Sequence, residues 1–279
     1  KKEKKPKKEK PKKEKKEKPK KEKPEKPKKE KTSKSVKKYL LKDLFKKTDM
    51  DDDFVKKICE EYKSTILKTE LEEQIYSTYK KVNKTKIQAD LGLEVDSKKY
   101  MIGLISRLTD QKGLDLVDAV MNDICQDGVQ FIVLGTGDPH YEEMFKYYQG
   151  FHPAKVSANI YFSDELSHKM YGGCDAILVP SRFEPCGLTQ LMALRYGSLP
   201  IVRETGGLND TVIPYNEYEQ TGTGFSFANY DPQELLKTIN YAKEVFCTQK
   251  KNWEAMQLRA MNEDYSWASS AKKYEEIYQ

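Results

Sequence analysis

The sequence is poor in the residues from which disulfide frameworks and metal centres are built. It has five cysteines, scattered along the chain, and three histidines among 279 residues. Because no Cys-x-x-Cys pair and no cysteine–histidine cluster occurs, neither a disulfide framework nor a zinc site is indicated. Scattered cysteines fit a reducing compartment, so we expect a cytoplasmic protein.

Long apolar runs are also missing. No stretch approaches the length of a membrane span, and no signal-peptide pattern is visible. We therefore expect no membrane span. The chain begins with Lys1 instead of Met, as a fragment of a longer protein would, so the missing signal carries little weight.

The first 31 residues lack every apolar side chain except proline. They consist of 19 Lys, 7 Glu and 5 Pro and carry a net charge of +12, whereas the whole chain carries +6 and the remainder therefore −6. Such a segment cannot bury enough surface to offset its ordering entropy, so we predict a disordered tail over residues 1–34. The tail is either a spacer, which we favour, or an electrostatic tether to polyanions such as nucleic acid, anionic lipid or an acidic partner.

Residues 35–96 are rich in charge but carry apolar residues at helical spacing. We predict a charged helical linker of two or three amphipathic helices. They are interrupted near Asp51–Asp53, where acidic residues suit a helix start. Three consecutive carboxylates do not share one helix face, so a metal site is disfavoured there.

From Tyr100 onward, short apolar runs alternate with helical stretches. The runs are YMIGLIS, VQFIVLG, ANIYF, DAILVP and LPIVR, and the helical stretches are KGLDLVDAVMNDICQ, HYEEMFKYYQG, DELSHKMYGG and GLTQLMALRYG. Near-continuous apolar runs are typical of parallel strands covered on both faces. The alternation predicts an open, doubly wound α/β sheet of parallel strands, a Rossmann-like fold, over residues 97–279. Ligands bind such sheets at the carboxyl ends of the strands.

The loops after the first two predicted strands carry cations and glycines. Arg107 and Lys112 lie in one loop that leads into a helix, an arrangement that suits phosphate oxygens. Gly135–Pro139 form a tight turn that lets backbone approach a ligand. Its sequence, GTGDP, is not the G-x-G-x-x-G pattern, so dinucleotide binding loses its main support.

The loops after the fourth and fifth predicted strands contain further glycines and a carboxylate. Glu184 stands just ahead of a helix that we expect to begin around Cys186 to Thr189, and Gly187 permits close approach to it. Free N–H groups at that helix start suit a diphosphate, and the carboxylate suits sugar hydroxyls. Thr205–Gly207 open a second helix in the same way.

Five stretches of the sequence resemble one enzyme family. ISRLTDQKGLDLV, LGTGDP, PSRFEPCGLTQLMALRYGSLPIVRETGGLNDTV, TGTGFSFANYD and EDYSWASSAKKYEEIY are similar, in this order, to the carboxyl-terminal domain of bacterial glycogen synthase and plant-type starch synthase. The resemblance runs from about Tyr76 to Gln279. It implies a GT-B glycosyltransferase of two Rossmann-like domains that transfers glucose, with retention, from ADP-glucose to the non-reducing end of an α-1,4-glucan.

The same resemblance bears on cofactors and location. It implies that no metal and no cofactor is needed beyond the nucleotide-sugar donor, and the residues leave ADP-glucose and UDP-glucose both open. A plant or algal source would make the plastid the expected location.

The resemblance also assigns roles to individual residues. Arg107 and Lys112 match the pair that neutralises the donor diphosphate, and Glu184 matches the glutamate beside the donor glucose, so these three are the expected catalytic residues. Phe162 falls where the family usually has a tyrosine stacked on adenine. The residues that match the cradle around the sugar and phosphates are Cys186, Gly187, Leu188, Thr189, Thr205, Gly206 and Gly207.

Two further positions have a counterpart in the family. His168 lies in the family's Ser-His pair but on a predicted helix, where we expect packing rather than catalysis. Met192 stands where many related retaining transferases have a second glutamate. Glycogen synthases usually lack that glutamate too, which favours this subfamily.

The family's amino-terminal domain is not recognisable before Tyr76. Neither its KTGGL-like loop nor its histidine facing the donor glucose occurs there. We therefore expect the donor-binding half of a synthase that needs an amino-terminal domain, in the parent chain or in trans. A stand-alone, non-catalytic nucleotide-sugar or glucan-binding module with a polybasic tether is the alternative. A nucleic-acid-associated protein is a third hypothesis, which the acidic body disfavours.

Overall fold

The computed structural model describes residues 68–125 and 128–278. They belong to a compact unit that spans Thr65–Gln279. The predicted disordered tail, and the part of the predicted linker before residue 68 with Asp51–Asp53, lie outside the described residues.

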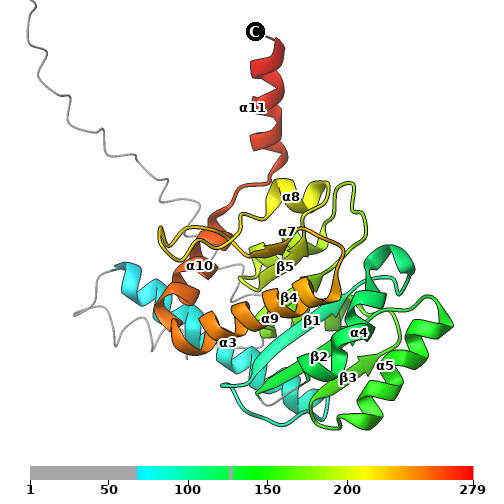
Figure 1. The fold of residues 1–279 in the computed structure, drawn as a ribbon. Coiled ribbons are helices and arrows are strands. Elements are labelled where there is room, and N and C mark those ends of the chain that lie inside the picture. Colours follow the sequence, from blue (N-terminus) through cyan, green and yellow to red (C-terminus); the bar gives the residue numbers. More distant parts are fainter. Residues whose placement is uncertain (1–67, 126–127, 279) are drawn as a thin grey trace, which may run out of the picture. The chain divides into compact units, whose positions relative to one another are not determined.

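A six-stranded sheet with every strand pair parallel lies at the centre of this unit (Figure 1). The strand order is β3-β2-β1-β4-β5-β6. Helices cover both faces, so β1, β2 and β4 are buried along almost their whole length. This arrangement confirms the predicted doubly wound α/β fold. The strands are β1 (Tyr100–Ile105), β2 (Val129–Leu134), β3 (Val156–Asn159), β4 (Ala176–Val179), β5 (Leu199–Arg203) and β6 (Phe225–Phe227).

Two strands differ from the sequence-based prediction. β3 ends at Asn159, so the last three residues of the predicted strand ANIYF lie in the following loop. β6 has no predicted counterpart, because its three residues are too few to form a recognisable apolar run. It extends the sheet by parallel pairing with β5, where Phe225 lies opposite Ile201.

The residues of β1 alternate between two apolar cores. Tyr100, Ile102 and Leu104 pack with residues of α4, α5, α9 and α10, whereas Met101 packs with residues of α3 and α6. Helices α4, α5, α6 and α7 correspond to the four predicted ones. The helices are α3 (Lys68–Asp90), the short η1 (Asp110–Lys112), α4 (Leu114–Ile124), α5 (Pro139–Phe151), α6 (Asp164–Gly173), α7 (Thr189–Arg195), α8 (Gly207–Thr211), α9 (Pro232–Thr248), α10 (Lys250–Asn262) and α11 (Trp267–Tyr278).

Helix α3 is part of the compact unit, whereas the sequence analysis placed residues up to 96 in a linker. Tyr76, Tyr79 and Ile87 are buried, and α3 packs against α6. The predicted boundary between residues 96 and 97 therefore falls inside the unit. The buried face of α3 is hard to recognise in the sequence, because two of its buried residues, Lys80 and Lys84, are charged.

Polar groups at the amino edge of the sheet hold these two lysines. Lys84 Nζ lies 2.6 Å from Asp175 Oδ2. Lys80 Nζ donates to two backbone carbonyl oxygens and, at 2.7 Å, to Ser198 Oγ. Burial lowers the pKa of Lys80 to about 8, although the Asp175 carboxylate opposes this shift.

We predict that Lys80 makes stability depend on pH above about 8. Between pH 8 and the ordinary pKa of 10.5, the unfolded chain binds a proton at this side chain that the folded chain does not. The free energy of unfolding of the natural chain should therefore rise relative to that of Lys80→Met across this range, by up to roughly 3 kcal/mol. Urea unfolding of both chains at several pH values measures the difference. A difference that does not change with pH would contradict a lowered pKa.

Three loops at the carboxyl edge of the sheet lie backbone against backbone. Gly113, after β1, has a φ of 70°, and a Cβ there would lie 2.0 Å from the carbonyl oxygen of Pro180, after β4. A Cβ at Gly207, after β5, would lie 1.9 Å from the carbonyl oxygen of Cys186. Any side chain at either glycine would push the loops apart, so their close approach requires glycine.

We expect Gly113→Ala and Gly207→Ala each to lower the free energy of unfolding by at least about 2 kcal/mol, because backbone must move to admit the methyl group. Gly150→Ala is the matched control, since a Cβ at this position of α5 would meet nothing within 4 Å. That variant should be neutral or more stable by up to about 1 kcal/mol. Urea unfolding compares the three, and equal stabilities would show that the loops move apart at little cost.

Candidate functional site

The carboxyl ends of β1 and β4 lie side by side at the centre of the sheet, because the two strands pair in parallel with Ile102 opposite Ala176. The strand order reverses here, with β2 and β3 on one side and β5 and β6 on the other. In open α/β sheets a ligand crevice forms at such a switch point. Most of the predicted site residues lie in the loops after β1, β4 and β5.

Lys112 and Glu184 meet at this switch point. Lys112 Nζ lies 2.6 Å from Glu184 Oε2, which also accepts a hydrogen bond from Ser181 Oγ at 3.0 Å. The two charged side chains are only 17% and 12% exposed, so water screens their attraction weakly. Among the described residues, none donates to Glu184 Oε1. The pair therefore retains an acceptor on Glu184 and donors on Lys112 for a ligand.

Neighbouring groups fix the backbone that carries Glu184. On the β1 side, the amide of Arg182 donates to the carbonyl oxygen of Gln111 at 2.9 Å. On the β5 side, Arg203 Nε donates to the carbonyl oxygen of Ser181 at 3.0 Å, and Arg203 Nη2 donates to that of Arg182. Sequence reasoning gave no role to Gln111, Ser181 or Arg203. All three stand inside the quoted motifs, but nothing in the sequence shows which loops they join.

A cation–aromatic cluster borders this loop. The guanidinium of Arg182 lies 4.7 Å from the centroid of the Tyr230 ring, and that of Arg203 lies 5.6 Å from it. The Tyr230 hydroxyl donates to Asp115 on α4, which also lies 3.4 Å from Arg182. Burial, together with the bond to Asp115, raises the pKa of Tyr230, so the hydroxyl stays protonated at neutral pH.

Arg107 lies in the same loop as Lys112 and is exposed. Within residues 68–125 and 128–278, no side chain or carbonyl group pairs with its guanidinium. The structure thus places both predicted cations after β1 but shows no contact between them. The free guanidinium fork suits an anion with several oxygens.

The loop from Cys186 to Thr189 turns sharply into α7. Gly187 has a φ of 74°, and Gln190 Nε2 donates to the carbonyl oxygens of Cys186 and Gly187 at 3.1 and 3.0 Å. In the described part of the chain, no backbone group accepts from the amides of Gly187 and Leu188. These amides are unpaired donors of the kind that we expect at a helix start. The helix that follows them, α7, has seven residues.

In the second predicted ligand-binding loop, Thr205–Gly207, both glycines contact other parts of the protein. The amide of Gly207 donates to the carbonyl oxygen of Glu184 at 3.1 Å. A Cβ at Gly206 would lie 2.3 Å from the same oxygen. Both glycines thus hold the loop after β5 against the loop after β4, and the Gly207 amide is already occupied.

The glycines of the predicted GTGDP turn also meet protein backbone. A Cβ at Gly135 would lie 1.8 Å from the carbonyl oxygen of Ser106, and one at Gly137 would lie 2.3 Å from that of Leu108. The turn therefore packs against the loop after β1. Its glycines serve that contact, and the approach of this backbone to a ligand stays a prediction.

Three other predicted residues lie outside these loops. Phe162, after β3, is 89% exposed, so its ring face is open. His168 Nδ1 lies 2.7 Å from the hydroxyl of Tyr196, with the two rings 5.8 Å apart, which agrees with a packing role. Met192 is partly exposed on α7.

Among the described residues, no group of three or more His, Cys, Asp or Glu side chains could hold a metal ion. Cys125, Cys174, Cys186 and Cys247 are free thiols, whereas Cys59 lies outside the described residues. None of the helices in residues 68–125 and 128–278 combines the length and the apolar character that a membrane crossing requires.

Known proteins share both the sequence and the fold. Residues 85–251 match the family model described as glycosyl transferases group 1. Glycogen synthase of Lachnospira eligens is 61% identical over 196 residues, which are 70% of this chain and 41% of that protein. Glycogen synthase of Lachnoclostridium phytofermentans is 56% identical over 197 residues, which are 71% and 41% of the two chains.

Among solved structures, the catalytic domain of Starch Synthase IV from Arabidopsis thaliana bound to ADP and acarbose is similar, with a TM-score of 0.66 and 35% sequence identity. The match covers 71% of this chain and 42% of that chain. The chain thus spans about two fifths of the length of these relatives. The comparisons confirm the resemblance to the carboxyl-terminal GT-B domain of glycogen and starch synthases. The family model matches more than half of the residues of this chain, so the chain belongs to the glycosyl transferase group 1 family.

Proposed function

We propose that the chain is the donor-binding half of a glycogen or starch synthase. Its reaction is the transfer of glucose, with retention, from ADP-glucose to the non-reducing end of an α-1,4-glucan. The observation that carries the proposal is the 2.6 Å contact of Lys112 with Glu184 at the strand switch point. Glycogen synthases at up to 61% identity and a starch synthase structure bound to ADP support it.

The cations after β1 are the groups that we assign to the donor diphosphate. Lys112 and Arg107 would stabilise the departing ADP, on which negative charge grows in the transition state. Lys112 is already paired with Glu184, so a bound diphosphate would share its charge with that carboxylate. Arg107 has no such competitor among the described residues.

Glu184 and the neighbouring loop are the groups that we assign to the glucose ring and the base. The oxygen Oε1 of Glu184 accepts a hydrogen bond from a hydroxyl of the sugar. This bond is charge-assisted and lies in a partly shielded site. The unpaired amides of Gly187 and Leu188 add donors for phosphate oxygens. The exposed ring of Phe162 offers a stacking face for adenine.

The proposed reaction requires a second domain. In a GT-B enzyme the donor lies in a cleft between two domains, and closure supplies groups around the reacting carbon and excludes water. The chain spans only 41% of its curated relatives, so we propose an amino-terminal domain as partner, in the parent chain or in trans. The glucan acceptor, a polyanionic partner for the tail, a cytoplasmic location and a reaction without metal stay predictions.

A non-catalytic nucleotide-sugar-binding module is the second candidate. It needs only the loops that we assign to the donor, and the described residues contain these loops. Both candidates predict ADP binding. Only the first predicts glucose transfer when an amino-terminal domain is supplied.

We expect Lys112→Ala and Arg107→Ala each to weaken ADP binding by about 1.5–3 kcal/mol, because each removes a charge-assisted contact. Calorimetric titration of the full chain with ADP measures the change. Lys98→Ala is the control, since Lys98 is exposed just before β1, at the opposite edge of the sheet. Unchanged affinity in both site variants would contradict the assignment.

The chain alone should not elongate glycogen from ADP-glucose, because half of the transition-state contacts are missing. Addition of a matching amino-terminal domain should restore transfer, and Glu184→Ala should then abolish it. Incorporation of labelled glucose into glycogen measures both effects. Robust incorporation by the chain alone would contradict the need for a second domain. No incorporation with the domain present, in a chain that binds ADP, would favour the non-catalytic module.

A further inference from the structure

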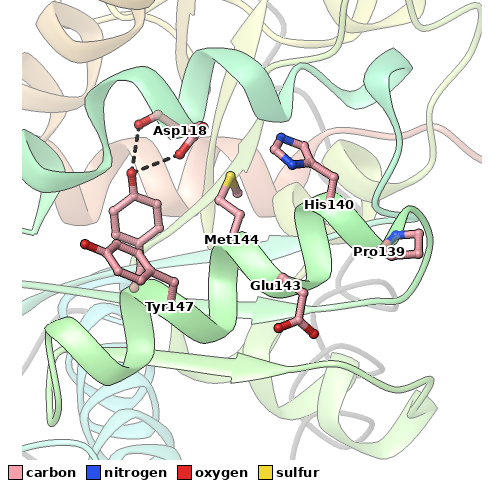
Figure 2. A pocket seen from close by; sticks show the side chains of 7 residues that line it. Asp118, Pro139, His140, Glu143, Met144 and Tyr147 are labelled. Atoms are coloured by element: carbon pink, nitrogen blue, oxygen red, sulfur yellow. Dashed lines mark hydrogen bonds between the residues drawn. The ribbon is translucent and has the colours of Figure 1, made fainter.

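A groove between α4 and α5 lies apart from the donor-side loops (Figure 2). Its volume is about 570 Å³. Sites for small molecules usually measure about 300–1,000 Å³. The groove is lined by Asp118, Pro139, His140, Glu143, Met144, Tyr147 and Tyr148.

The walls of the groove combine an apolar floor with carboxylates. Met144 and Tyr148 are buried, and the Tyr148 hydroxyl donates to Asp118 Oδ1 at 2.9 Å. This bond orients the Asp118 carboxylate. In Figure 2 the side chains of His140 and Met144 point toward the helix that carries Asp118, whereas Glu143 points away from it.

Two aromatic rings extend the groove along the outer face of α5. Tyr147 is 63% exposed and Phe151, one helical turn later, is 62% exposed. Their ring centroids are 6.0 Å apart and their planes differ by only 12°. Contiguous exposed apolar surface is one mark of a binding site, and the two rings join the apolar floor of the groove.

We propose that this groove and the two rings bind a segment of α-1,4-glucan, at a site separate from the donor site. The proposal rests on the proposed function, which makes a glucan the acceptor. A pyranose ring presents C–H faces that suit aromatic rings and hydroxyl edges that suit carboxylates and imidazole. The lining contains no lysine or arginine, so it lacks the cations that a phosphorylated ligand requires. Its two carboxylates, of which Glu143 also pairs with Lys146 at 2.7 Å, offer acceptors to the hydroxyls of a neutral polyol.

The backbone around the groove argues against an extended peptide as occupant. Both walls are α-helices, whose amide and carbonyl groups bond within the helix. A peptide strand in the groove would find no backbone partners for its own polar groups, which carry a cost when buried unpaired. Glucan hydroxyls need only the side-chain acceptors that are present.

The groove is connected to the loop that carries Lys112. The hydroxyl of Tyr141, on α5, donates to Asp110 at 2.6 Å, and Asp110 begins the short helix that ends at Lys112. Helix α5 also begins at the carboxyl edge of the sheet, where Asp138 caps it by accepting from the amide of His140. A glucan held here would raise the local concentration of acceptor chains near the donor site.

Calorimetric titration of the full chain with maltoheptaose tests the site. Tyr147→Ala and Phe151→Ala should each weaken binding by about tenfold, because each removes a stacking face. Tyr147→Trp keeps an aromatic face and should retain binding. Tyr218→Ala is the matched control, since Tyr218 is 91% exposed in the loop between β5 and β6. All four substitutions are at exposed positions, so thermal unfolding should be unaltered.

Two comparisons separate this proposal from the proposed function. Cellohexaose, with β-1,4 linkages, should bind more weakly than maltoheptaose, and ADP affinity should be the same in every variant of the groove. Equal maltoheptaose affinity in Tyr147→Ala, Phe151→Ala and Tyr218→Ala, or no maltoheptaose binding by a chain that binds ADP, would overturn the glucan site. An ADP affinity that Lys112→Ala and Arg107→Ala leave unchanged would instead count against the donor site and leave a positive maltoheptaose result intact.

Discussion

The parallel pairing of β1 with β4 is the contact on which the site depends. It brings together the ends of two strands that are separated in the sequence by the short η1, three α-helices and two further strands. Gly103 leaves room beside this pairing for two neighbouring side chains, since a Cβ there would lie 2.9 Å from both Cys174 Sγ and Ile177 Cδ1. Only because the strands end at the same edge do Lys112 and Glu184 reach each other.

The ion pair between these residues determines how an anion can bind at the site. Lys112 and Glu184 neutralise each other in a partly shielded position, and Ser181 adds a hydrogen bond to the same carboxylate oxygen. An anion that enters must therefore compete with Glu184 for Lys112. The competition favours ligands that offer the carboxylate a new donor in exchange, as a sugar hydroxyl joined to a diphosphate does.

The sequence allowed the sheet and its loops to be predicted because buried parallel strands are apolar along their whole length. It did not reveal α3 as part of the domain, because Lys80 and Lys84 are buried there through bonds to groups distant in sequence. The resemblance to the synthases pointed to Lys112 and Glu184. Their contact, and the support from Arg203, depend on loop packing that no local pattern records.

The glycine contacts between the loops have a consequence for how such a domain can diversify. At Gly113, Gly206 and Gly207 an added Cβ would meet carbonyl oxygens of neighbouring loops, so the loops lie closer together there than any side chain would permit. The side chain of Leu188, which is 63% exposed on the loop after β4, takes no part in that spacing. Substitutions there change the surface that the loops present to solvent while the backbone contacts keep their positions, so that surface can diversify while the frame of the domain is kept.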